Sequence, residues 1–160
     1  GEIVSAANFN SPGQTVIAGD ASAVERAIIL CKEAAAKRAL PLNVSVPSHC
    51  ALMKPAAVEL EKILNDITFS APAIAVVQNV TAELAQSADE IKVNLIKQLY
   101  APVLWVDCIE VISKSGINKL VECGPGKVLS GLIKRIDSDI RCFGSDDSAS
   151  LDSAIGEMAI

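Results

Sequence analysis

The sequence is poor in aromatic side chains, which make up 3% of its 160 residues, and it contains a single histidine. Hydrophobic residues nevertheless account for 51% of the chain, so its core must be built from alanine, valine, isoleucine and leucine. That mixture is typical of helices packed on a parallel sheet whose strands are buried on both faces. The length corresponds to one or two domains.

Several kinds of protein are excluded by what is missing. No apolar run approaches the roughly 18–20 residues that a membrane-spanning helix needs. The net charge of −5 gives no basic footprint for nucleic acid. One histidine and no CxxC pair leave too few clustered ligands for zinc, so we expect no metal and no tightly bound cofactor. The sequence has no internal repeat and no low-complexity segment.

Cysteine usage indicates the compartment. The five cysteines are an odd number and none lies at a metal-ligand spacing from another. We also expect no secretory leader. These features favour a reducing environment over a disulfide framework. We therefore expect a cytoplasmic protein.

Turn residues and apolar periodicity predict the elements of the first 46 residues. Two short strands, 1–7 and 14–19, flank a Pro-Gly turn and predict a hairpin. A capping box formed by Ser22 and Glu25 predicts a helix that runs to about residue 36. The extended run 39–46 predicts a third strand.

From residue 47 onward, helices and strands alternate as in an α/β layered fold. Pro55 suits the first turn of a helix, Ser87 and Glu90 form a second capping box, and Gly116 suits the end of a helix. We expect helices at about 55–67, 88–99, 106–114 and 128–136, strands at 73–77, 119–122 and 141–143, and a surface helix over the last dozen residues.

His49 is the candidate for acid–base chemistry. Pro47 has no N–H to donate and ends any strand pairing there, so His49 is expected in a loop between two elements. Loops on rigid scaffolds often carry functional side chains. A lone histidine makes no motif by itself, and a structural or surface role is the alternative.

His49 has no evident nucleophile as a partner. No G-x-S-x-G turn occurs in the 160 residues. Ser48 and Cys50 flank the histidine, but adjacent side chains on an extended backbone point to opposite faces, so neither is a good partner. The group that spacing alone nominates to orient the imidazole is Glu122, an acid at the end of a predicted strand.

Five segments resemble, in the same order and with similar spacing, the malonyl-CoA:acyl carrier protein transacylase family. They are Asn8–Gly19, Lys37–Leu42, Val46–Met53, Gln98–Val103 and Glu122–Leu129. The resemblance implies an α/β fold in which a ferredoxin-like subdomain is inserted into an α/β-hydrolase-like domain. Residues 1–46 would be part of the small subdomain, and residues 47–160 would be the C-terminal part of the large one.

The resemblance implies transfer of malonyl from coenzyme A to the phosphopantetheine thiol of acyl carrier protein, through a seryl ester, in fatty-acid biosynthesis. It makes His49 the general base, oriented by the backbone carbonyl of Gln98, with Glu122 as the alternative. Asn10 and Gln14 would border the acyl pocket, although an Asx turn and strand pairing explain them equally well. Arg38 would meet a coenzyme A phosphate, which a guanidinium suits.

The nucleophilic serine, the arginine that clamps the malonyl carboxylate and the oxyanion loop of the family have no counterpart in the 160 residues. We therefore expect a C-terminal half that is inactive alone and needs the N-terminal half of the same protein. The expected partners are that half, acyl carrier protein and the coenzyme A thioester, with no nucleic acid and no membrane. The alternatives are an acyltransferase fragment of a polyketide or fatty-acid synthase, and a non-catalytic module that binds carrier protein through Lys127, Lys134 and Arg135.

Overall fold

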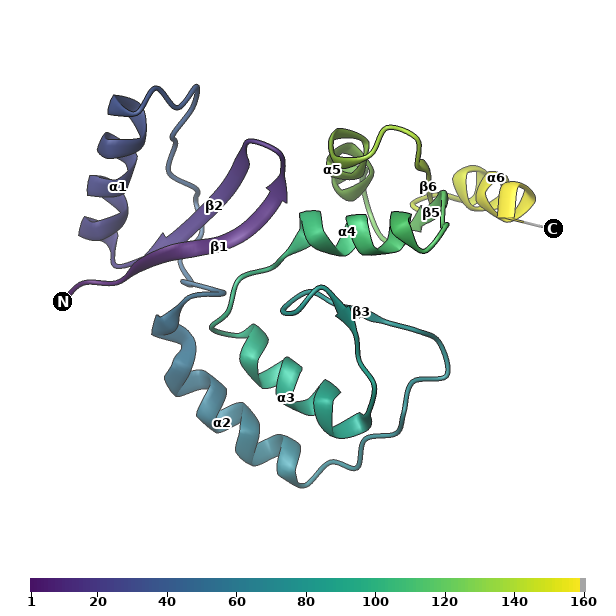
Figure 1. Cartoon of the computed structure of the whole chain (residues 1–160), viewed down its shortest axis with the longest axis horizontal. Helices are drawn as coiled ribbons and strands as arrows, with labels where there is room; N and C mark the ends of the chain where they lie inside the picture. Colours follow the sequence, from purple (N-terminus) through teal and green to yellow (C-terminus); the bar gives the residue numbers. More distant parts are fainter. Residues whose placement is uncertain (159–160) are drawn as a thin grey trace.

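The computed structural model describes residues 1–158, which begin with an antiparallel hairpin and a helix (Figure 1). Strand β1 (Val4–Ser11) pairs with β2 (Gln14–Gly19), and Val4 lies opposite Gly19. Helix α1 (Ala21–Glu33) then packs along the hairpin. Gly19 has no room for a side chain, because a Cβ atom there would lie 2.0 Å from the carbonyl oxygen of Ile3. The predicted hairpin is confirmed.

Two predictions in this region are wrong. Helix α1 begins after Asp20, and Ser22 lies inside it and donates a hydrogen bond of 2.5 Å to Glu2, so Ser22 and Glu25 form no capping box. Residues 39–46 form an irregular, mostly exposed segment instead of a third strand. Their composition favours an extended chain, but a strand also needs a neighbour whose backbone it can pair with. The backbone N–H of Val44 bonds only locally, to Leu42.

Two helices run side by side in the next part of the chain, α2 (Lys54–Asn65) and α3 (Ala88–Gln98) (Figure 1). A single 3₁₀ turn, η1 (Ala51–Met53), precedes α2. Pro55 lies in the first turn of α2, as predicted. The capping residues of α3 are also as predicted: the Ser87 hydroxyl accepts the N–H of Glu90 at 3.1 Å, and the Glu90 carboxylate accepts the N–H of Gln86 at 2.7 Å.

The strand predicted over 73–77 is wrong except for its last residue. Only β3 (Val77–Gln78) pairs, and its partner β4 (Glu83–Leu84) is equally short. The apolar residues before β3 have the composition of a buried strand, but they lie outside this short ladder and are irregular.

The remaining elements follow the predicted alternation: α4 (Trp105–Lys114), β5 (Lys119–Glu122), α5 (Val128–Ile136), β6 (Arg141–Gly144) and α6 (Ser148–Met158). Strands β5 and β6 are parallel, with Lys119 opposite Arg141. Helices α4 and α5 pack beside them on a buried cluster formed by Ile109, Ile133 and Ile140, and α6 contacts β6. Helix α4 ends before Gly116, whose φ of +82° suits glycine.

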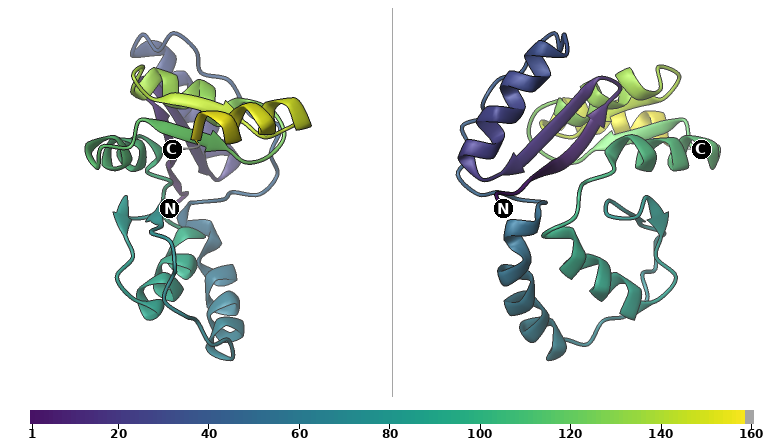
Figure 2. Two further views of the ribbon diagram at one scale, coloured as in Figure 1. Left: turned by 90° about the vertical axis from the view of Figure 1, so that its right-hand side faces the viewer. Right: turned by 60° about the vertical axis from the view of Figure 1, so that its left-hand side comes forward.

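Among the described residues, the expected parallel sheet is present only as this pair. The strands within residues 1–158 form three two-stranded sheets, and the other two are antiparallel. Three groups of elements meet at the connection between α3 and α4 (Figure 2). They are the hairpin with α1, the pair α2 and α3, and the elements from α4 onward. There Val103 accepts the N–H of Phe9 at 2.9 Å and donates to Ala7 at 2.8 Å, which ties the hairpin to the end of α3. None of the helices up to residue 158 has the length and apolar character needed to cross a membrane.

Candidate active site at the end of helix α3

The backbone of His49 adopts a conformation that few residues other than glycine tolerate. Its φ is +63°, in the left-handed region, and its N–H donates to the carbonyl oxygen of Leu99 at 3.0 Å. A non-glycine residue held in this region is uncommon and tends to occur at functional sites. The hydrogen bond to Leu99 fixes the histidine against the C-terminal end of α3.

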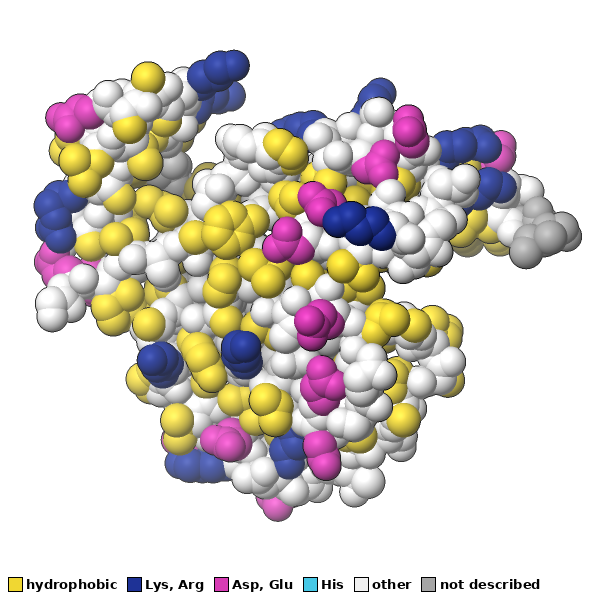
Figure 3. Space-filling model, viewed as in Figure 1, with side chains coloured by type: hydrophobic (Ala, Val, Ile, Leu, Met, Phe, Trp, Pro, Cys, Tyr) yellow, Lys and Arg dark blue, Asp and Glu magenta, His cyan; other side chains and the backbone are white. Residues whose placement is uncertain are grey.

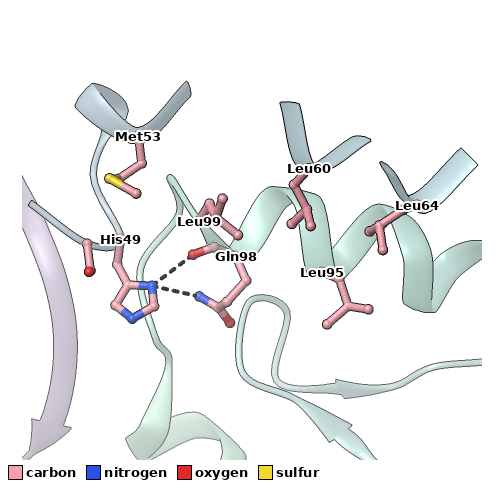
Figure 4. A pocket seen from close by; sticks show the side chains of 8 residues that line it. His49, Met53, Leu60, Leu64, Leu95, Gln98 and Leu99 are labelled. Atoms are coloured by element: carbon pink, nitrogen blue, oxygen red, sulfur yellow. Dashed lines mark hydrogen bonds between the residues drawn. The ribbon is translucent and has the colours of Figure 1, made fainter. Parts of the chain in front are cut away.

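The imidazole of His49 is held by the same helix end (Figure 4). Its Nδ1 lies 2.8 Å from the backbone oxygen of Gln98. A carbonyl can only accept, so Nδ1 carries the hydrogen in this pair, and in the neutral ring Nε2 then keeps its lone pair. The geometry therefore leaves Nε2 able to accept a proton from a neighbouring group.

The sequence explains why the carbonyl oxygens of Gln98 and Leu99 are free to accept hydrogen bonds from His49. A helical carbonyl normally accepts the N–H four residues later. For Gln98 that residue is Pro102, which has no N–H. For Leu99 it is Val103, whose N–H bonds to Ala7 of the hairpin instead. Both oxygens are thus left for the backbone and ring of His49.

A cavity of about 310 Å³ lies between α2 and α3, beside the imidazole (Figure 4). Its wall is almost wholly apolar and consists mainly of five side chains: Met53, Leu60, Leu64, Leu95 and Leu99. The polar residues that complete the lining are Ser48, His49 and Gln98, and no lysine or arginine is among them. A charged acyl group would need its counter-ion from elsewhere.

The two neighbours of His49 differ in accessibility. Ser48 is exposed, whereas Cys50 is fully buried and its thiol donates to the carbonyl oxygen of Pro47 at 3.2 Å. The backbone here turns at His49 and is not extended as expected, and the buried thiol of Cys50 bonds to Pro47 and not to the imidazole.

Glu122, the acid that spacing alone predicted to orient the imidazole, forms its hydrogen bonds with helix α5. Its carboxylate accepts the N–H groups of Leu129 and Ser130 at 2.9 and 2.8 Å and the Ser130 hydroxyl at 2.6 Å. Burial raises the pKa of this carboxyl, but the hydrogen bonds from Ser130 and Leu129 together lower it below its ordinary value. Glu122 therefore caps the N-terminus of α5.

The other predicted site residues are not among those that line the cavity. Asn10 lies in β1, and Arg38 is exposed in the segment after α1. Gln14, at the start of β2, accepts a hydrogen bond of 2.8 Å from Arg135 of α5. Of the basic residues, Lys127 precedes α5, and Lys134 and Arg135 lie in its last turn.

The structure thus brings His49 and Gln98 together and leaves Asn10, Gln14 and Arg38 apart from them. The link between Gln14 and Arg135 was not predicted, because no local pattern connects residues so distant in the sequence. Within residues 1–158, no three histidine, cysteine or acidic side chains converge as metal ligands do.

The chain is similar along its whole length to known transacylases. No protein-family model matches it. It is 54% identical over 160 residues to the malonyl CoA-acyl carrier protein transacylase of Haemophilus influenzae and 54% identical over 155 residues to that of Salmonella typhimurium. These alignments cover 100% and 97% of this chain but 51% and 50% of the relatives, so the chain spans about half their length.

Solved structures agree with these relatives. An acyl carrier protein S-malonyltransferase from Vibrio cholerae matches with a TM-score of 0.94 and 59% identity, over 96% of this chain and 50% of that one. A type II PKS acyl-carrier protein in complex with its malonyl-transacylase matches with a TM-score of 0.95 and 53% identity, over 98% of this chain and 50% of that one. The resemblance found in the sequence is confirmed, and so is the mixed α/β fold of these acyltransferases.

Proposed function

We propose that this chain is the C-terminal half of a malonyl-CoA:acyl carrier protein transacylase of fatty-acid biosynthesis, with His49 as its general base. The observation that carries the proposal is the hydrogen bond of 2.8 Å from Nδ1 of the only histidine to the main chain at Gln98, which leaves Nε2 free to accept a proton. Identity of 54% over all 160 residues to a transacylase supports it. Residues 1–46 belong to a ferredoxin-like subdomain, and residues 47–160 belong to an α/β-hydrolase-like domain.

In this proposal the reaction has two halves. Nε2 of His49 takes the proton of a serine hydroxyl while the serine oxygen attacks the malonyl thioester; the C–S bond breaks and the coenzyme A thiolate leaves with that proton. The phosphopantetheine thiol of acyl carrier protein then gives its proton to Nε2 and attacks the seryl ester. The serine oxygen leaves as the C–O bond breaks and recovers the proton from His49.

The serine and the carboxylate clamp come, in this proposal, from the half of the enzyme that the chain does not span. The apolar cavity supports this, because its wall has no cation for the malonyl carboxylate. Asn10 and Gln14 border the acyl pocket of the assembled enzyme, and Arg38 meets a phosphate of coenzyme A. No cofactor is held tightly, and the enzyme works in the cytoplasm.

The surface supports a second half of the molecule as a partner. Hydrophobic side chains reach the surface over much of the face in Figure 3. Among the most exposed are Leu42 and Val44 of the irregular segment 39–46, at 62% and 69%. Apolar area exposed on this scale marks an interaction site. The relatives are about twice as long as this chain, so we propose that a segment equivalent to their remaining half covers this apolar surface.

Malonyl transfer from coenzyme A to carrier protein tests the proposal directly. The 160-residue chain alone should give no transfer, whereas co-expression with the missing half of a relative such as the Haemophilus influenzae enzyme should restore it. Transfer by the isolated chain would contradict the proposed division of the site. A complemented enzyme that assembles but transfers nothing would contradict the function.

A further inference from the structure

The side chain of Gln98 makes contacts that its backbone carbonyl does not explain. Its amide nitrogen donates to the carbonyl oxygens of Ala101 at 3.0 Å and Pro102 at 3.4 Å. These two residues form the connection that leaves the end of α3. The amide therefore ties this connection back to the helix turn that holds His49.

The same amide nitrogen also lies 3.5 Å from Nδ1 of His49. An amide nitrogen can only donate, so a hydrogen bond between these two atoms would require Nδ1 to have lost its hydrogen. The ring would then carry its hydrogen on Nε2, the atom that the proposed base needs free. The carbonyls of Ala101 and Pro102 occupy both amide hydrogens and keep them from Nδ1.

We propose that the side chain of Gln98 is a positioning residue that fixes the tautomer of His49. It acts through the two hydrogen bonds of its amide, which hold the last turn of α3 and with it the carbonyls of Gln98 and Leu99. This inference rests on the proposed role of His49 as the base, but the tautomer itself can be measured without any catalysis.

The single histidine makes that measurement unambiguous. In the 160-residue chain labelled with ¹⁵N, all imidazole signals in a long-range ¹H–¹⁵N spectrum belong to His49, and nitrogen shifts distinguish a protonated from an unprotonated ring nitrogen. At a pH where the ring is neutral, we expect mainly the Nδ1–H tautomer. Gln98→Leu keeps the backbone carbonyl and removes the amide, so we expect the tautomer ratio to fall about fivefold, the value of one neutral hydrogen bond.

Gln86→Leu is the matched control. The Gln86 amide also donates to a backbone carbonyl, that of Leu84 at 2.9 Å, but it lies before α3 and is not among the residues that line the cavity. The control should leave the His49 signals unchanged. An unchanged tautomer ratio in folded Gln98→Leu, or an equal change in both variants, would overturn the inference.

A second measurement covers the case in which Gln98→Leu does not fold. In the unsubstituted chain, both side-chain amide hydrogens of Gln98 should exchange with solvent more slowly than those of Gln86, because both are bonded in a half-buried position. Equal exchange rates would overturn the inference. Failure of the proposed transferase function would appear in the transfer assay and would leave the tautomer and exchange results untouched.

Discussion

Pro102 stands four residues after Gln98, and this spacing is the reason that the Gln98 carbonyl can accept a hydrogen bond from His49. A helix that continued with any other residue would offer an N–H to that oxygen. The orientation of the His49 imidazole thus depends on Pro102, which lies 53 residues later in the chain (102 − 49) and has no backbone N–H.

Replacing Pro102 by alanine should therefore weaken the hold on the imidazole. The new N–H competes with His49 for the Gln98 oxygen, and loss of a hydrogen bond of this kind should reduce malonyl transfer by the complemented enzyme about tenfold. Pro72→Ala, in the exposed segment before β3, makes the same substitution away from the site and should leave transfer unchanged. Equal rates for the two variants would show that the missing donor is unimportant.

His49→Asn separates the imidazole from its backbone conformation. Asparagine tolerates the left-handed region better than most residues, so this variant keeps the backbone at φ +63° more readily than His49→Ala does. Loss of a general base should lower kcat about 10²–10⁴-fold in the complemented enzyme, with an unchanged circular dichroism spectrum. A kcat close to that of the unsubstituted enzyme would remove His49 from the mechanism.

Ala35 offers a stabilising substitution. It follows α1 with a φ of +63°, and the N–H of Ala36 bonds to Cys31, the arrangement in which glycine is usual. Ala35→Gly relieves about 1–2 kcal/mol of strain and adds about 0.5–1 kcal/mol of chain entropy to the unfolded state. Urea unfolding should show a gain of about 0.5–1 kcal/mol. Ala36→Gly is the control, and a gain there of the same size would contradict the strain argument.

The cap formed by Glu122 should make stability depend on pH. The pKa of Glu122 lies below its ordinary value of 4.5 in the folded chain, so the unfolded chain takes up this proton first as the pH falls. Its contribution is complete above about pH 4.5 and is lost as the pH falls through the folded pKa. Glu122→Gln should lower the free energy of unfolding at neutral pH and flatten its acid dependence. Glu61→Gln, at an exposed position of α2, should do neither.

The cysteines should differ in reactivity according to their burial. Burial, and to a lesser extent the neighbouring Asp107, raises the pKa of the Cys108 thiol from its ordinary 9.0 to about 11. Its thiolate fraction at neutral pH is thus about a hundredfold smaller than that of an ordinary thiol. Alkylation followed by mass spectrometry should find exposed Cys31 and Cys123 modified long before Cys108 and buried Cys50. Early modification of Cys108 would contradict the packing of α4.

The C-terminal elements were predictable because their signals are local. Strand β5 and helix α5 begin and end where the sequence predicted them, since the turn at Gly124 and Gly126 separates two distinct apolar patterns. The segment 39–46 was not predictable, because strand formation depends on a partner that no local pattern reveals. The capping box predicted at Ser22 was wrong for a similar reason, because the Ser22 hydroxyl donates its hydrogen bond to Glu2, a residue twenty positions away.

The site was predictable only in part. Composition and spacing made His49 a candidate base and Glu122 the candidate to orient it, and the predicted contact with Gln98 came from the family resemblance. Nothing local predicts the left-handed backbone of His49, because the conformation is imposed by the bond to Leu99. The side-chain bonds of Gln98 follow from the turn at Pro102 and need the coordinates of that turn to be seen.

Because the acceptor for the imidazole belongs to the main chain, no codon change at position 98 can delete it, short of altering the path of the backbone. Natural selection at that codon consequently acts on the amide side chain alone. A saturation library confined to codon 98, scored by growth of cells that depend on the enzyme, would rank the substitutions by how well each replaces the amide.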